Sequence, residues 1–206
     1  MLFTIIGILG AILFLVGDYS YFRDTIKGKT TPQRVTWGVA FLLNSIGFAN
    51  QYASGAGNSL WLFGAAVLAT GLIFVASIFK GVGGYSKLDV SAVAITLLGV
   101  ILWMIFDSPL LSVLSMLVVA VVSLTPTILK ARKHPESETR IAWLFGSISA
   151  LMGAISVVEL NWILLILPLN AALVQAYISY ILYFETKRHH EVGVTPAHGP
   201  GEPVEL

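Results

Sequence analysis

Apolar residues occur along this chain in seven long stretches separated by short polar segments. Each stretch is close to the ~20 residues that an α-helix needs to cross the hydrocarbon core of a membrane. Membrane-spanning strands are not expected, because they run about ten residues and alternate in polarity. The pattern predicts seven helices, which cover Leu2–Phe22, Val35–Ala53, Leu60–Phe79, Val90–Phe106, Pro109–Leu129, Ile141–Leu160 and Trp162–Phe184.

The positive charges are distributed unevenly between the connections. All twelve lysines and arginines lie in alternate connections or after the last stretch. Cationic loops stay on the cytoplasmic side of a membrane, so we expect the N-terminus outside and the C-terminus in the cytoplasm. These residues are Arg23, Lys27, Lys29, Arg34, Lys80, Lys87, Lys130, Arg132, Lys133, Arg140, Lys187 and Arg188.

Composition agrees with an all-α integral membrane protein whose main partner is the lipid bilayer. The chain is 56% hydrophobic and 11% charged, against about 25% charged residues in soluble domains. The net charge of +1 gives no reason to expect a nucleic-acid partner. Cysteine is absent from the sequence, so neither disulfides nor thiolate metal sites can form. We expect no cofactor and no metal.

Local signals predict the ends of several helices. Asp89, and the pair Asp107 and Ser108, have the character of N-caps for the fourth and fifth stretches. Glu136 and Glu138 are expected in the first turn of the sixth helix, where carboxylates complement the helix dipole.

The hydropathy pattern also contains an internal repeat. A shift of 103 positions places Lys27 on Lys130, Pro32 on Pro135, and Asn44 on Ser147. Three stretches, a single one and three more give two units of equal orientation, which is a parallel repeat. The predicted organisation is a first three-helix repeat at 1–80, a linker helix at 81–107, a second three-helix repeat at 108–185, and a disordered cytoplasmic tail at 186–206.

This 3+1+3 pattern resembles the SWEET/PQ-loop-like superfamily, and in particular an uncharacterised bacterial group within it. The resemblance implies seven transmembrane helices with an external N-terminus, and a location in the bacterial plasma (inner) membrane. The residues that carry it are Tyr21, Phe22, Ile26, Gly28, Lys29, Thr30, Pro32, Trp37, Pro126, Thr127, Lys130, Pro135, Glu138 and Thr139. The pair Pro32-Gln33 begins a helix instead of ending one, so it is not the motif of that family.

Polar residues within the stretches are the candidates for a solute site, because a polar side chain in hydrocarbon is costly. Asn44 lies at the middle of the second stretch, and Ser147 lies in the sixth beside Gly146, Ala150 and Ala154. This spacing of small residues permits a close approach between helices.

The seventh stretch has Asn170 near its middle. The helical period places Tyr177 on the same face and points Gln175 elsewhere. In the SWEET proteins that this chain resembles, an asparagine of the last helix of each repeat binds the solute; Asn170 matches that position. The corresponding residue of the first repeat is Val67, and the nearest polar candidate is Thr70.

Prolines and acidic residues bear on mechanism. Pro126 and Pro168 each remove a backbone donor inside a helix and predict a bend, either as hinges for rocking or as static kinks.

Asp18 lies near the inner aromatic and basic belt, so we expect cytoplasmic water to reach it. Glu159 is expected at the outer interface. Without a central acidic residue, an ion-driven pump is disfavoured.

The sequence therefore predicts a transporter for the passive, alternating-access movement of a small neutral or zwitterionic polar solute, such as a sugar, nucleoside or vitamin. The alternative is a membrane scaffold or accessory protein whose polar residues only hold helices together. An enzyme is not expected, since all four histidines lie in a loop or the tail. The sequence does not specify which solute is bound, and it is compatible with a homo-oligomer.

Overall fold

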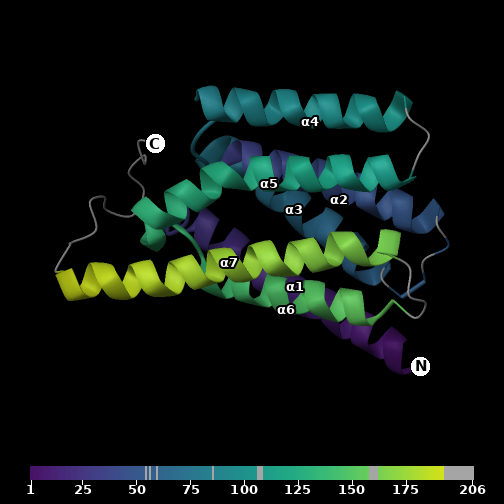
Figure 1. Cartoon of the computed structure of the whole chain (residues 1–206). Coiled ribbons are helices and arrows are strands. Elements are labelled where there is room, and N and C mark those ends of the chain that lie inside the picture. Colours follow the sequence, from purple (N-terminus) through teal and green to yellow (C-terminus); the bar gives the residue numbers. More distant parts are fainter. Residues whose placement is uncertain are drawn as a thin grey trace.

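Each predicted apolar stretch corresponds to one helix in the computed structural model (Figure 1). The structure describes residues 1–53, 55, 57–58, 60–84, 86–105, 109–157 and 162–192. Its elements are α1 (Leu2–Ile26), α2 (Arg34–Ala53), α3 (Leu60–Lys80), α4 (Lys87–Ile105), α5 (Pro109–Lys133), the 3₁₀-helix η1 (Pro135–Ser137), α6 (Arg140–Ile155) and α7 (Trp162–Val192).

The main differences from the predicted bounds lie in the last two helices. α7 continues to Val192, so residues 186–192 are helical where a disordered tail was predicted. α6 ends at Ile155. The remainder of the predicted sixth span, including Glu159, is outside the described residues, and so are Asp107 and Ser108.

Four of the described helices are long and apolar enough to cross a membrane: Leu2–Ile26, Leu60–Lys80, Leu114–Lys133 and Leu164–Arg188. α6 is apolar but shorter, at 16 residues. The outward side chains of these helices are large and apolar; Leu68 is 67% exposed and Phe79 is 80% exposed on α3. An apolar outer surface of this kind needs lipid or another apolar partner, as expected for an integral membrane protein.

Six helices, α1 to α3 and α5 to α7, form the bundle, and α4 lies at its edge. α3 packs between α1 and α2, and α7 packs between α5 and α6. α1 also contacts α6, and α2 contacts α5. α4 packs on α5 and α2, and it lies along the edge of the bundle (Figure 1).

Glycines of α1 allow its close approach to α6. A Cβ atom at Gly17 would lie 2.9 Å from Cβ of Phe145, and one at Gly10 would lie 3.1 Å from Cβ of Met152. Both separations are shorter than ordinary packing allows, so a side chain at either glycine would push the helices apart. The predicted small residue Ala150 is buried on α6, but Gly10 and Gly17 provide the close contact.

The three connections that carry lysine and arginine lie at one end of the bundle, together with the C-terminal end of α7; the N-terminus lies at the other (Figure 1). We call this the basic end. Gln33 forms an isolated bridge with Val82, and Thr31 N–H donates to the carbonyl of Ser137 at 3.2 Å. The guanidinium of Arg34 donates to the carbonyl of Gly83 at 2.8 Å. The three connections therefore form one hydrogen-bonded layer.

Two predicted helix starts are wrong in detail. Ser86, not Asp89, caps α4: its hydroxyl accepts from Asp89 N–H at 3.0 Å, and the Asp89 carboxylate accepts from Ser86 N–H at 3.2 Å. This reciprocal pair is a capping box. Glu138 precedes α6 and turns inward, where it forms a 2.5 Å ion pair with Lys130. Its role is therefore ion pairing at the buried layer and not the dipole interaction that we expected.

Candidate functional site

A cavity of about 170 Å³ lies inside the helix bundle. Residues from α1, α2, α3, α5, α6 and α7 line it, and none of the described residues of α4 does so. Its walls are mostly apolar. Polar side chains interrupt the walls at Asp18, Tyr21, Thr36, Trp37, Asn44, Thr70, Ser123, Trp143, Asn170 and Gln175.

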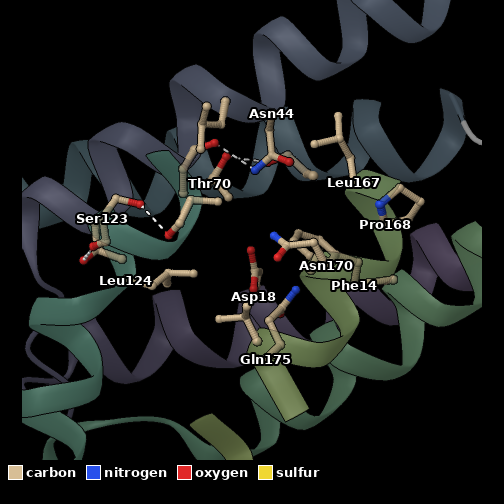
Figure 2. A pocket seen from close by; sticks show the side chains of 18 of the residues that line it. Phe14, Asp18, Asn44, Thr70, Ser123, Leu124, Leu167, Pro168, Asn170 and Gln175 are labelled. Atoms are coloured by element: carbon tan, nitrogen blue, oxygen red, sulfur yellow. Dashed lines mark hydrogen bonds between the residues drawn. The ribbon is translucent and has the colours of Figure 1, made fainter. Parts of the chain in front are cut away.

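Three of these polar side chains point into the cavity and have no hydrogen-bond partner among the described residues. Asp18, Asn170 and Gln175 face the same space in Figure 2. Asp18 is only 6% exposed, and its buried Oδ2 accepts no hydrogen bond from any residue that the structure describes. Within that same part of the chain, the side-chain amides of Asn170 and Gln175 also make no hydrogen bond. Polar groups of this kind are available for a ligand or for water.

Asn44 and Thr70 also line the cavity, as the sequence predicts, but each already makes one hydrogen bond (Figure 2). The Asn44 amide donates to the carbonyl of Ala40 at 2.9 Å, and the Thr70 hydroxyl donates to the carbonyl of Ala66 at 2.6 Å. Their side-chain oxygens keep acceptor capacity. These two residues can therefore accept hydrogen bonds from a solute.

Ser147 and Tyr177 do not line the cavity, although both were predicted to. The Ser147 hydroxyl donates to the carbonyl of Ala172 at 2.9 Å, which joins α6 to α7. The Tyr177 hydroxyl accepts from Arg132 at 2.6 Å, and its side chain is 42% exposed. Gln175 was predicted as a solute-site candidate on another face of the helix than Asn170; it lines the same cavity and packs against Gly146.

Asp18 is the functional candidate that the sequence misplaced. It was expected within reach of cytoplasmic water, but the structure buries it in the cavity wall. Phe14, Asp18 and Tyr21 follow one another at intervals of four and three residues, so they share one face of α1. The presence of a carboxylate on an inward face was the signal available in the sequence.

Three aromatic rings separate the cavity from the basic end. The ring centroid of Tyr21 lies 4.7 Å from Trp37 and 6.4 Å from Trp143, and the two tryptophans lie 6.1 Å apart. We call these rings the aromatic triad. Trp37 Nε1 donates to the Tyr21 hydroxyl at 3.3 Å. Trp143 Nε1 donates to Glu138 Oε2 at 2.9 Å, which joins the triad to the Lys130–Glu138 pair behind it.

Some cavity-lining residues have equal spacings in α2 and α6, and in α3 and α7. Trp37 and Trp143 are each the fourth residue of their helix, since α2 begins at Arg34 and α6 at Arg140. Counted from these helix starts, Asn44 has the same position in its helix as Ala150, whereas the 103-position shift pairs it with Ser147. The lining residues Leu62, Phe63, Ala66 and Thr70 have the same spacing as Leu167, Pro168, Ala171 and Gln175.

Both helix prolines are accompanied by a polar side chain from α2. Pro168 lines the cavity and has no N–H to donate to the carbonyl of Leu164; Gln51 Nε2 donates to that carbonyl instead, at 3.4 Å. Near Pro126, the Thr36 hydroxyl donates to the carbonyl of Ser123 at 2.7 Å. α5 bends toward its C-terminal end in Figure 1. The Gln51 contact replaces the backbone hydrogen bond that Pro168 removes. The carbonyl that Pro126 leaves without its backbone donor is that of Val122, one residue before the carbonyl that Thr36 binds.

Over the described residues, histidine, aspartate and glutamate form no group of three or more that could hold a metal ion. The cavity offers a carboxylate, three side-chain amides and aromatic rings, which are groups able to contact a polar or charged ligand. Comparison with family models, with curated proteins and with solved structures finds no match to this chain.

Proposed function

We propose that this chain is a seven-span transporter that binds a small polar solute in the central cavity and releases it on either side of the membrane by passive alternating access. The proposed architecture is two parallel three-helix units joined by α4. The helix order α1, α3, α2 in one half recurs as α5, α7, α6 in the other. In this order α1 is equivalent to α5 and α2 to α6, so the contact of α1 with α6 is equivalent to the contact of α5 with α2. This symmetry supports the repeat and its likeness to the SWEET arrangement.

The observation that carries the proposal is the Asn170 side-chain amide, which faces the cavity and makes no hydrogen bond to the described part of the protein. An asparagine that only joins helices would spend its hydrogen bonds on them. Asn170 can instead donate to and accept from a solute, beside Gln175 and Asn44. This distinction favours a transporter over the alternative of a scaffold protein.

The aromatic triad is the proposed gate at the basic end. Its three side chains are at most 6% exposed, so they close the cavity on that side. The Lys130–Glu138 pair lies behind it, with both side chains fully buried. Opening this side requires the halves to separate, and the helix prolines Pro126 and Pro168 are the proposed hinges. The hydrogen bonds from Thr36 and Gln51 then link α2 to both hinges.

Orientation follows from the charge distribution. With the basic end in the cytoplasm, the closed gate faces inward and the N-terminus lies outside. The proposed location is the bacterial plasma membrane.

A ligand screen on purified protein tests this function. Sugars, nucleosides, vitamins and amino acids are added, and the melting temperature is measured for the wild type and for Asn170→Leu, Asn44→Leu and Ser147→Ala. A solute that binds in the cavity should stabilise the wild type and Ser147→Ala, while Asn170→Leu abolishes its effect and Asn44→Leu weakens it. A membrane hydrogen bond averages only ~0.6 kcal/mol, so both leucine variants should still fold. If Asn170→Leu and Asn44→Leu respond to solutes as the wild type does, the cavity is not the site.

A further inference from the structure

We propose that the solute of this cavity carries a positive charge on an ammonium group, which Asp18 binds next to the aromatic triad and which a proton replaces when the cavity is empty. This inference rests on the proposed function, because it assigns a chemical class to the solute of the same cavity. It also changes the expected mechanism from passive movement to exchange of a cation for a proton.

The charge balance of the cavity is the first argument. Asp18 contributes a carboxyl group to the wall, and no lysine, arginine or histidine is among the described lining residues. Its Oδ2 accepts no hydrogen bond within the described part of the chain. A buried carboxylate without a counter-ion is unfavourable. A cationic ligand or a bound proton removes that unfavourable charge.

The aromatic triad supplies the second argument. Tyr21, Trp37 and Trp143 all line the same cavity as Asp18, and Tyr21 follows Asp18 by three residues on α1. Electron-rich faces of tryptophan and tyrosine attract ammonium groups, and several rings around one site select quaternary ammonium ligands. Neither tryptophan N–H points its hydrogen bond into the cavity: that of Trp37 donates to the Tyr21 hydroxyl, and that of Trp143 donates to Glu138 behind the triad. Neither N–H group is needed to satisfy the cavity, and part of each ring forms the cavity wall on the side of Asp18.

Few other charged or titratable groups face Asp18. On α1 the nearest is Tyr21, whose hydroxyl accepts from Trp37. The carboxylate of Glu138, behind the triad, is neutralised by Lys130 at 2.5 Å. The polar groups that the described residues of α2, α3, α5, α6 and α7 present to the cavity are uncharged; they are Thr36, Trp37, Asn44, Thr70, Ser123, Trp143, Asn170 and Gln175. Asp18 is thus the charged group of this cavity that is left to bind a cation.

The exchange is balanced in charge. As an ammonium ion enters, the O–H bond of protonated Asp18 breaks and the proton leaves to water, and the carboxylate then pairs with the ammonium. One positive charge enters and one leaves. Raising the pH removes the competing proton, so the apparent affinity for the cation should increase with pH, by up to about tenfold per unit while Asp18 is protonated.

Choline and 3,3-dimethylbutan-1-ol provide a matched pair of probes, because they have the same shape and differ by the positive nitrogen. Binding of each is measured by calorimetry and by thermal shift on full-length protein in nanodiscs, at constant ionic strength and at several pH values. The proteins are the wild type, Asp18→Asn, and Asp24→Asn. Asp24 is a suitable control, since it lies on the same helix but pairs with Arg23 outside the cavity.

We expect choline to bind the wild type and Asp24→Asn more tightly as the pH rises, and the neutral alcohol to bind neither. Asp18→Asn should lose choline binding at every pH. Equal binding of both probes, or choline binding that Asp18→Asn retains, would overturn the inference. If that variant does not fold, the probe comparison and the pH dependence of the wild type decide the matter alone.

The two proposals can fail separately. Should choline not bind while a neutral solute of the screen binds through Asn170, the cation inference is wrong and the transport function stands. If neither choline nor any solute of the screen binds, both proposals are overturned.

Discussion

The substitution Lys130→Met should be strongly destabilising, because it leaves Glu138 charged and buried. Neither side chain of the pair is exposed, and Nζ lies 2.5 Å from Oε1. Lys130 also donates to the carbonyl of Thr31, so its loss breaks a link between the first and third basic connections. Removing one partner of a buried ion pair costs about 3–5 kcal/mol, whereas an exposed pair contributes about 0–1 kcal/mol. We therefore expect Lys130→Met to lower the free energy of unfolding by about 3–5 kcal/mol.

Unfolding in mixed micelles with increasing SDS, followed by tryptophan fluorescence, measures this loss; Trp143 reports directly because it binds Glu138. Lys133→Met removes an exposed lysine from the same helix and should change the free energy of unfolding by less than about 1 kcal/mol. The double variant Lys130→Met with Glu138→Gln should regain part of the loss, since no buried charge remains unpaired. The reasoning is refuted if Lys130→Met and Lys133→Met have equal effects, or if the double variant is as unstable as the sum of its single changes.

Two further predictions concern helix packing and orientation. Gly17→Ala should destabilise the protein by about 1–3 kcal/mol, because its Cβ would lie 2.9 Å from that of Phe145. In the control Gly64→Ala, the added Cβ meets no atom closer than 3.6 Å, so this change should be neutral or slightly stabilising. Thermal unfolding of both variants measures the difference. In intact cells, a membrane-impermeant maleimide should label Gly57→Cys but not Lys27→Cys, and labelling in the reverse sense would invert the proposed topology.

The helices could be predicted from the sequence because the length of an apolar stretch is a local property. α2 and α3 begin within one residue of the predicted positions, at Arg34 and Leu60. Contacts between distant segments could not be predicted in the same way. Glu138 has the same local signal as any acidic residue near a helix start, but its partner Lys130 approaches only because η1 turns the chain back.

The candidate site was predicted in part for the same reason. Asn44 and Asn170 are polar residues in the middle of apolar stretches, which is a local signal, and both line the cavity. Asp18 was misplaced because aromatic and basic neighbours indicated an interface, whereas its depth depends on how α1 packs against α3 and α6. Tyr177 shares a helical face with Asn170 but lies nearly two turns further along α7, where Arg132 binds it.

Ala150 provides the most direct test of the claim that the central cavity carries the solute. Its side chain is 2% exposed and lines the cavity, so Ala150→Leu fills space that a solute would need. The spacing of small residues predicted a close contact between helices at this position, whereas the structure places Ala150 on the cavity wall. The control, Ala94→Leu, makes the same change at an exposed position of α4.

The deciding measurement is uptake into proteoliposomes of the solute identified by the screen. We predict that Ala150→Leu abolishes uptake while its thermal stability stays at or above that of the wild type, and that Ala94→Leu transports normally. Full uptake by a folded Ala150→Leu protein would contradict the central claim.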